Sequence, residues 1–355
     1  MAEVIRVLVP KVPEFKSYKK YLKQIDERKI YSNFGPLNNL LVERLAEYFG
    51  VSPENVCSVA NATLGIQGLI ETLHLSKENA EWFLPSWTFT ATATALAKTG
   101  SMATFVDIDH EWRAKFPERA EYLIDVAPFG DSINLSRLGQ RKAVIVDAAP
   151  SFDSLRKVNF GTAFPIAVVV SLHATKLLPA GEGGIVISNS ESWISEFKRW
   201  TNFGMDTDRI STILGTNGKL SEFSSAVALA SLDNWSITRE RFLDLRQRAL
   251  AISHLNDFLC APADEKFLAT PYWILRTKSQ QQTSDIEHRF WENRIETRKW
   301  WAVGLHKMKA FSNFSKGNLE ETERTSDRYL GLPFHFDLRN RDFARIESAL
   351  ADIAR

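Results

Sequence analysis

Short apolar runs alternate with amphipathic segments along the first two thirds of the chain. Helices are predicted over 14–28, 40–49, 62–73, 90–99 and 223–232, where apolar residues recur at helical spacing. The intervening runs are almost continuously Val, Ile, Ala or Phe, which is typical of strands buried on both faces of a mostly parallel sheet. These strands are predicted over 56–59, 82–84, 104–106, 123–126, 143–146, 166–171 and 184–187. The alternation predicts an α/β fold with a mostly parallel central sheet between helices.

The pattern changes near residue 240. A long charged helix is predicted over 239–255, a strand over 272–276 and a last helix over 341–354. A chain of 355 residues is also long enough for two domains. We therefore expect a large domain over 1–240 and a smaller C-terminal α+β domain over 241–355.

Charge and composition narrow the class of function. Lys and Arg (44) almost balance Asp and Glu (43), so the basic excess of a typical nucleic-acid binder is absent. The two cysteines, Cys57 and Cys260, are too few for a disulfide framework, and their spacing suits no metal site. The sequence has no signal-peptide pattern and no run of 18 uncharged apolar residues. We expect a soluble, cytoplasmic protein that acts on small molecules, without nucleic-acid or membrane partners.

The segment 168–188, VVVSLHATKLLPAGEGGIVIS, contains a candidate for covalent chemistry. Lys176 lies between two apolar strands, where partial burial would lower the pKa of its amine, as a Schiff-base lysine requires. A surface lysine in a long loop fits the same spacing about equally well. His173 is expected to position or pack rather than to act as a general base.

Two further segments lie where strands end. Asp147 directly follows a buried strand, at the edge where open α/β sheets bind ligands, and its carboxylate could stabilise a protonated ring nitrogen. The alternative is an aspartate that caps the next turn. Asn61, Ala62 and Thr63 precede a predicted helix, whose first N–H groups could bind a phosphate. Simple capping of that helix by Asn61 or Thr63 is the alternative.

Other candidates are weaker when taken singly. Trp87 and Phe89 in PSWTF could stack on a flat cofactor, although core packing is the usual role of an aromatic residue. Lys219, in the turn 215–222, could meet an anion or simply lie at a solvated helix start. The cluster of Asp107, Asp109 and His110 resembles metal ligands, but neighbours on an extended chain point to opposite faces, so no metal is expected.

In this order, the segments resemble the DegT–StrS family of PLP-dependent sugar aminotransferases, which have the aspartate aminotransferase (type I) fold. The resemblance runs nearly end to end, and SLHATK followed by GEGG is its most specific element. The other matching segments are YSNFGP (31–36), NAT (61–63), PSWTFT (85–90), FVDID (105–109), PFG (128–130), DAA (147–149), TNGKLSE (216–222) and LPFH (332–335).

The resemblance implies a role for each matching residue. Lys176 would form the Schiff base with pyridoxal 5'-phosphate (PLP) and shuttle protons, Asp147 would keep the ring nitrogen protonated, and Phe89 would stack on the ring. It also implies a homodimer with shared active sites. The remaining implied contacts are phosphate binding by Ala62, Thr63 and Ser171, binding of the neighbouring subunit's cofactor phosphate by Asn217, and substrate binding by Asn33, Phe34 and Lys219.

Two positions depart from the family's pattern. Pro150 stands where the family usually has Gln near the cofactor's phenolic oxygen, and Phe152 where it usually has His. The expected function is amino transfer from glutamate to a nucleotide-linked keto-deoxysugar, for polysaccharide or natural-product biosynthesis. The alternatives are a non-catalytic or regulatory protein of the same fold and a PLP-dependent sugar dehydratase. The family's dehydratases replace the Schiff-base lysine with histidine, so Lys176 argues against the last.

Overall fold

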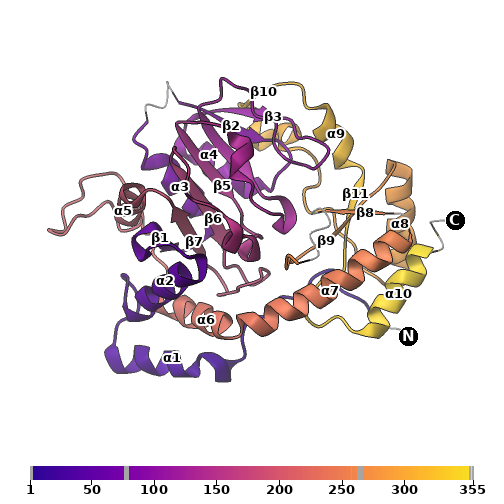
Figure 1. Cartoon of the computed structure of the whole chain (residues 1–355), viewed down its shortest axis with the longest axis horizontal. Coiled ribbons are helices and arrows are strands. Elements are labelled where there is room, and N and C mark those ends of the chain that lie inside the picture. The colour runs from indigo at the N-terminus through magenta and orange to yellow at the C-terminus, as the bar shows by residue number, and fades with distance from the viewer. Residues whose placement is uncertain (1–2, 76–79, 257, 262–266, 352, 354–355) are drawn as a thin grey trace.

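An eight-stranded sheet forms the centre of the larger part of the molecule (Figure 1). The computed structural model describes residues 3–75, 80–256, 258–261, 267–351 and 353. The order of the strands is β1-β7-β6-β5-β4-β2-β3-β10. Neighbouring strands are parallel except at β7, which runs antiparallel to both β1 and β6, so the predicted mostly parallel sheet is confirmed. The strands are β1 (Val56–Val59), β2 (Glu81–Pro85), β3 (Met102–Val106), β4 (Tyr122–Val126), β5 (Ala143–Asp147), β6 (Ile166–Ser171), β7 (Gly184–Ser188) and β10 (Ser315–Lys316).

Helices cover both faces of this sheet. The sheet thereby separates the hydrophobic core into two layers. Every residue of β5, β6 and β7 is buried, which explains their unbroken apolar sequences. One layer contains side chains of α3 (Ala62–Glu71), α4 (Thr90–Thr99) and α5 (Glu191–Trp200). The other contains side chains of α1 (Phe15–Arg28), α2 (Pro36–Phe49) and α6 (Glu222–Asp233).

The C-terminal part has a smaller antiparallel sheet of order β11-β9-β8. The long helix α7 (Trp235–Leu255) runs from the large part toward it, and α8 and α10 lie beside it (Figure 1). The remaining elements are β8 (Leu259–Ala261), β9 (Trp273–Arg276), β11 (Tyr329–Leu332), α8 (Gln280–Glu292), α9 (Glu320–Ser326) and α10 (Asn340–Ala351). Short 3₁₀ turns lie at Pro53–Asn55, Pro128–Gly130, Leu135–Leu138, Phe152–Lys157, Leu305–Lys307 and Lys309–Phe311.

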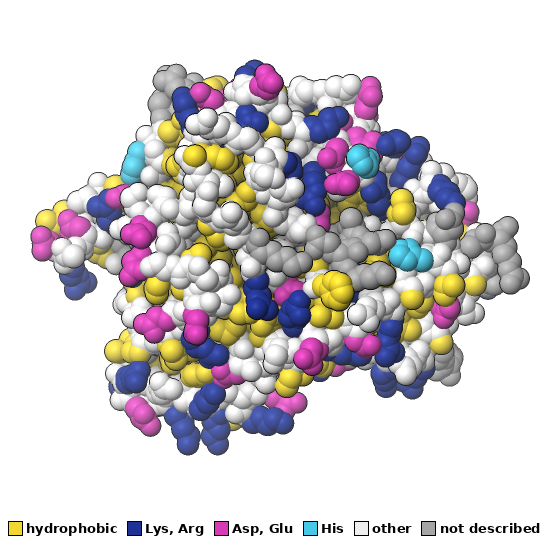
Figure 2. Space-filling view, in the orientation of Figure 1, with side chains coloured by type: hydrophobic (Ala, Val, Ile, Leu, Met, Phe, Trp, Pro, Cys, Tyr) yellow, Lys and Arg dark blue, Asp and Glu magenta, His cyan; other side chains and the backbone are white. Residues whose placement is uncertain are grey.

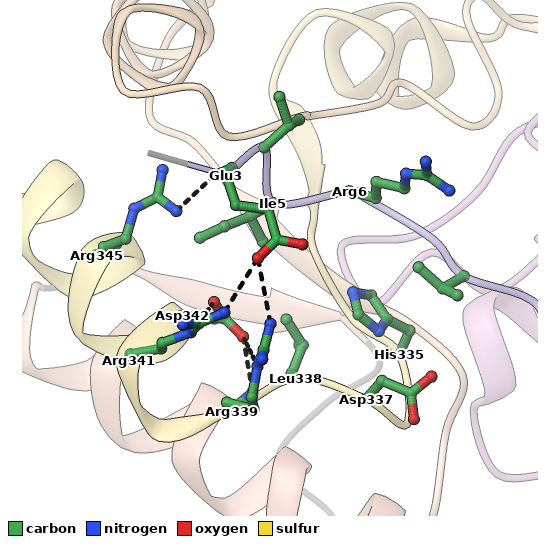
Figure 3. Close-up of a pocket in the computed structure, with 12 residues that line it drawn as sticks. Glu3, Ile5, Arg6, His335, Asp337, Leu338, Arg339, Arg341, Asp342 and Arg345 are labelled. Carbon is green, nitrogen blue, oxygen red and sulfur yellow. Dashed lines mark hydrogen bonds and ion pairs between the residues drawn. The ribbon is translucent and has the colours of Figure 1, made fainter. Parts of the chain in front are cut away.

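The N-terminal segment packs against this smaller part. The N–H of Ile5 donates to the carbonyl of Arg294 (3.0 Å), and the N–H of Phe334 donates to the carbonyl of Val7 (3.1 Å). Beside these contacts, a cavity of about 540 Å³ is lined by several arginines, among them Arg339 and Arg341, whose guanidinium groups meet the Glu3 carboxylate (Figure 3). Such exposed ion pairs contribute little each to stability, so the backbone hydrogen bonds are the stronger attachment of this segment.

Charge on the surface agrees with the near-neutral composition. On the face shown in Figure 2, Lys and Arg side chains are interspersed with Asp and Glu. Among the helices that the structure describes, none has the length and apolar character needed to cross a bilayer.

Candidate active site

A cavity of about 930 Å³ opens at the carboxyl ends of the central strands. Asp147 ends β5 and Ser171 ends β6, and both line it. Its opposite wall comes from the smaller part of the chain, through Tyr272, Arg298 and Trp301 among others. We call this space the Lys176 cavity. Its position is the one at which open α/β sheets bind ligands.

The resemblance assigns a cofactor or substrate role to ten residues, of which six line the Lys176 cavity and four do not. The six are Ala62, Thr63, Phe89, Asp147, Ser171 and Lys176. The four that lie elsewhere are Asn33, Phe34, Asn217 and Lys219.

Lys176 lies in the connection between β6 and β7. This connection folds back on itself, because the N–H of Ala174 donates to the carbonyl of Gly181 (2.9 Å). Gly181 has a φ of +86°, a conformation that favours glycine. The lysine side chain is half-buried, and its Nζ donates a hydrogen bond to the Tyr272 hydroxyl at 2.9 Å. The amine is therefore held inside the cavity rather than extended into solvent.

Asp147 is a buried carboxylate at the floor of the cavity. Its Oδ2 accepts a hydrogen bond from the Thr92 hydroxyl (2.6 Å), and its Oδ1 accepts one from the N–H of Ala149 (3.1 Å). Burial raises the pKa of this carboxyl above its ordinary value, and Thr92, Ala149 and the charge of Lys176 oppose that rise. The two sequence interpretations are thus compatible, since Asp147 bonds the following turn and also lines the cavity.

The N-terminus of α3 points two unpaired donors toward the same space. Asn61 caps the helix by accepting from the N–H of Leu64 (2.9 Å), as the simpler interpretation required. The N–H groups of Ala62 and Thr63 have no acceptor within the part of the chain that the structure describes. Gly184 backs this turn so closely that a Cβ there would lie 2.8 Å from the Ala62 nitrogen. These two N–H groups at the positive end of a helix are suited to bind an anion.

The two aromatic residues of PSWTF have different environments. Trp87 is buried, with its ring edge-on to Trp301 (5.4 Å) and Tyr329 (4.9 Å). Phe89 leads into α4 with 58% of its surface exposed, and it lines the cavity. Phe89 is therefore the one with a ring face available to a ligand.

The cavity residues that sequence reasoning did not find include Tyr272, Arg298, Trp300 and Trp301. The Trp300 ring lies edge-on to Tyr272 at 5.0 Å and beneath the Arg298 guanidinium at 5.0 Å. Only the adjacent tryptophans gave a local signal. Their distance in sequence from Lys176 concealed that they share a site with it.

Other candidate residues have structural roles. Asp107 accepts from the N–H groups of Glu321 and Thr322, at the start of α9. Asp109 accepts from the N–H groups of Glu111 and Arg113 within its own turn. No group of three or more His, Cys, Asp or Glu suited to a metal occurs among the described residues.

His173 lines the cavity, and so does only one of the two residues that differ from the family's pattern, Pro150 and Phe152. The Nδ1 of His173 lies 2.8 Å from the Thr175 hydroxyl, and His173 lines the cavity with Pro150. Phe152 does not line it. It is buried under α2 and stacked on Tyr48 (5.2 Å), so the change at 152 affects packing.

The four remaining predicted residues lie around a buried glutamate. Glu222 begins α6, and its carboxylate accepts from the N–H groups of Leu37 and Asn38, both at 2.8 Å. Its own N–H donates to the carbonyl of Tyr31 (2.9 Å). We call these three hydrogen bonds of Glu222 the clamp. The clamp lies at the start of α2, which begins at Pro36, four residues before the start that apolar periodicity predicted. It also joins the loop 31–36 to the turn 215–222.

We call the exposed region around this clamp the Glu222 surface. Asn33 and Asn217 are exposed on it, while Phe34 and Lys219 are half-buried. The Lys219 amine lies over the ring of Phe203 at 4.6 Å, and burial lowers its pKa. Tyr31 and Phe223 are exposed and stacked on each other at 6.1 Å, and the connection between α5 and α6 adds the exposed hydrophobic residues Phe203, Ile210 and Leu214.

Comparison with known proteins gives a consistent result. The model of the DegT/DnrJ/EryC1/StrS aminotransferase family matches residues 14–351. The chain is 26% identical to the dTDP-4-amino-4,6-dideoxy-D-glucose transaminase of Shigella dysenteriae over 377 residues, covering 99% of this chain and 100% of the relative. A proposed PLP-dependent aminotransferase from Bacillus cereus ATCC 10987 superposes with a TM-score of 0.87 and 25% identity, covering 98% of this chain and 100% of that one. DesI, crystallised in the presence of its TDP-sugar product, gives 0.84 and 26%, covering 100% and 94%. The expected aminotransferase fold is confirmed.

Proposed function

The chain belongs to the DegT/DnrJ/EryC1/StrS aminotransferase family, and from this premise we propose that it transfers the amino group of glutamate to a nucleotide-linked keto-deoxysugar, with PLP as cofactor. The relative from Shigella dysenteriae and the DesI structure support a nucleotide sugar as the substrate class. The observation that carries the proposal is that an amine, Lys176, and a buried carboxylate, Asp147, line one cavity.

The residues of the Lys176 cavity fit PLP in three respects. Asp147 is a buried acceptor that suits a protonated ring nitrogen, whose positive charge would favour the ionised carboxylate. The unpaired N–H groups of Ala62 and Thr63 suit a phosphate. Phe89 offers an exposed ring face to a planar group. Ser171, at the end of β6, lines the same wall.

When bound, the cofactor supplies an electron sink for breaking the C–H bond next to the transferred nitrogen. The chain's own groups do the rest. Lys176 takes up and releases a proton at Nζ, and Asp147 holds the ring nitrogen in its protonated form. The aromatic wall formed by Phe129, Trp300 and Trp301 restricts water at the reacting atoms.

Arg298 supports an amino acid as the donor. Its side chain lines the cavity and lies over Trp300, and no ion pair to it occurs among the residues that the structure describes. A guanidinium in this setting suits the carboxylate of an incoming amino acid.

We further propose that the protein acts as a homodimer in the cytoplasm, with the Glu222 surface completing the partner's site. Asn217 and Lys219 would reach the partner's cofactor phosphate and substrate, and Asn33 and Phe34 would contact its substrate. The exposed hydrophobic residues around them support burial against a second copy.

The test supplies the PLP-loaded enzyme with ¹⁵N-glutamate and a panel of nucleotide-linked keto-deoxysugars. We expect ¹⁵N in the sugar product, detected by mass spectrometry, for at least one member. Lys176→Ala is the control and should give no label. Label that appears in no sugar, while glutamate still converts the cofactor to its amine form, would refute the sugar as acceptor and leave the aminotransferase chemistry standing.

A further inference from the structure

The Tyr272 hydroxyl is in direct contact with the Lys176 amine. Tyr272 lies just before β9, in the smaller part of the chain, 96 residues after Lys176. Its hydroxyl accepts from Lys176 Nζ at 2.9 Å, and no other partner of that hydroxyl occurs among the described residues. The position of Nζ therefore depends on this hydroxyl.

The Tyr272 ring is fixed by packing. It is buried, with the ring of Trp300 at 5.0 Å and that of Phe129 edge-on at 5.8 Å. A ring held between two aromatic neighbours has little rotational freedom, so its hydroxyl stays at one point in the cavity.

The segment that carries Tyr272 is bound to the large part of the molecule. The buried carboxylate of Asp153 accepts from the N–H of Ala269 (2.9 Å) and from Arg239 Nε (2.6 Å). The Thr270 hydroxyl donates to the carbonyl of Tyr272 (3.0 Å). Gly130 packs so tightly against this segment that a Cβ would lie 3.1 Å from Pro271 Cδ. These contacts fix the position of Tyr272 in the cavity wall.

We propose that Tyr272 is a positioning residue for Lys176. Its hydroxyl keeps Nζ inside the cavity by accepting one of its N–H bonds, and so directs the remaining valences of the nitrogen toward the bound ligand. The proposal rests on the proposed role of Lys176. If Tyr272 has this role, a residue of the smaller part of the chain positions the reactive amine of the larger part.

Without the hydroxyl, Nζ is no longer held at one point in the cavity wall. In the cofactor-free protein, we expect Tyr272→Phe to increase the rate at which trinitrobenzenesulfonate modifies Lys176 at a fixed pH by about threefold or more, the effect of releasing one hydrogen bond, as measured by mass spectrometry of peptides. In the loaded enzyme, kcat should fall about tenfold with KM within about twofold, and the isotope effect with α-deuterated glutamate should increase.

Tyr329→Phe is the matched control. Tyr329 belongs to the same aromatic cluster, but its hydroxyl accepts from the N–H of Trp301 (2.7 Å) and does not contact Lys176. This variant should lower Tm and leave the modification rate of Lys176 and the isotope effect unchanged.

The outcomes separate this inference from the function on which it rests. A Tyr272→Phe protein with the wild-type modification rate of Lys176 and the wild-type isotope effect overturns the positioning role. Equal changes in both variants would also overturn it, because they would reflect packing alone. If borohydride fixes PLP to no lysine of the wild-type protein, or to a lysine other than Lys176, the proposed function fails first.

Discussion

The Lys176 cavity and the Glu222 surface are both built from conspicuous polar residues, yet they differ in what they leave unsatisfied. In the cavity, the N–H groups of Ala62 and Thr63 have no acceptor among the residues that the structure describes, and burial disfavours the charged form of the Asp147 carboxylate. On the surface, the polar groups of Glu222 are satisfied within the chain, and the unsatisfied component is apolar area.

This difference indicates what completes each region. Unpaired donors and a buried charge are relieved by a small ligand with an anionic end and a cationic end. Exposed hydrophobic side chains are relieved by another protein surface. We therefore expect the cavity to bind a ligand, and we propose that the surface binds a second subunit.

The largest expected effect removes the cavity's amine. Lys176→Ala should lower transamination at least about a thousandfold, because among the described residues no other lysine lines the cavity. Borohydride should then fix no cofactor, as measured by mass spectrometry of peptides. Lys142→Ala, at an exposed amine that pairs with Glu121, is the control and should retain fixation. Wild-type labelling at a different lysine would overturn the assignment.

Asp147→Asn should affect turnover and stability in opposite directions. We expect turnover to fall by orders of magnitude while the fold is retained, because the ring loses its charge partner. Burial raises the pKa of Asp147, so in the cofactor-free protein the wild type should lose stability relative to the variant as pH rises above about 4. Half-reaction rates and thermal unfolding between pH 4 and 8 measure both effects. Turnover close to the wild-type value would show that this carboxylate does not face the ring.

A mixing experiment tests whether the surface serves the partner's cavity. Lys176→Ala and Asn217→Ala should each be weak, but a mixed dimer would place both lesions in one site and recover up to about half of one dimer's activity. Mixing Lys176→Ala with Asp147→Asn is the control, since each site would then carry one lesion. Recovery in neither mixture, with subunit exchange verified by tagged chains, means that Asn217 acts within its own subunit.

The smallest effect concerns the clamp itself. Glu222→Ala would leave the N–H groups of Leu37 and Asn38 without acceptors at the start of α2, and should lower the free energy of unfolding by about 2–4 kcal/mol. Glu222→Gln retains one acceptor and should cost less. Denaturant unfolding measures both. A loss below about 0.5 kcal/mol in Glu222→Ala would indicate that water satisfies these groups and that the clamp is not structural.

The sequence predicted the central sheet well because its signals are local. Burial on both faces gives β6 an unbroken apolar sequence, and that sequence ends at the residue where the site begins. The start of α2 was wrong by four residues because it depends on Glu222, 185 residues away. Helix α5 was missed although Ser190 caps it and apolar residues recur at helical spacing. A local pattern was therefore available there.

The candidate site was predictable only on one side. Its floor comes from residues that follow strands or precede helices, which topology alone gathers at one sheet edge. Its opposite wall, including Tyr272 and Arg298, depends on how the second sheet packs against the first. No periodicity or motif around those two residues records that packing, so sequence reasoning could not place them.

The contacts of the N-terminal segment affect the order in which the molecule can be completed on the ribosome. Val7 bonds the Glu296 side chain across 289 residues, and the next residue, Leu8, lines the Lys176 cavity. That stretch of cavity wall lacks this hydrogen bond until the segment around Glu296 has been synthesised and has left the exit tunnel. Lys176 is synthesised long before then, so we expect a nascent chain to expose its amine before it can bind a cofactor in a closed site.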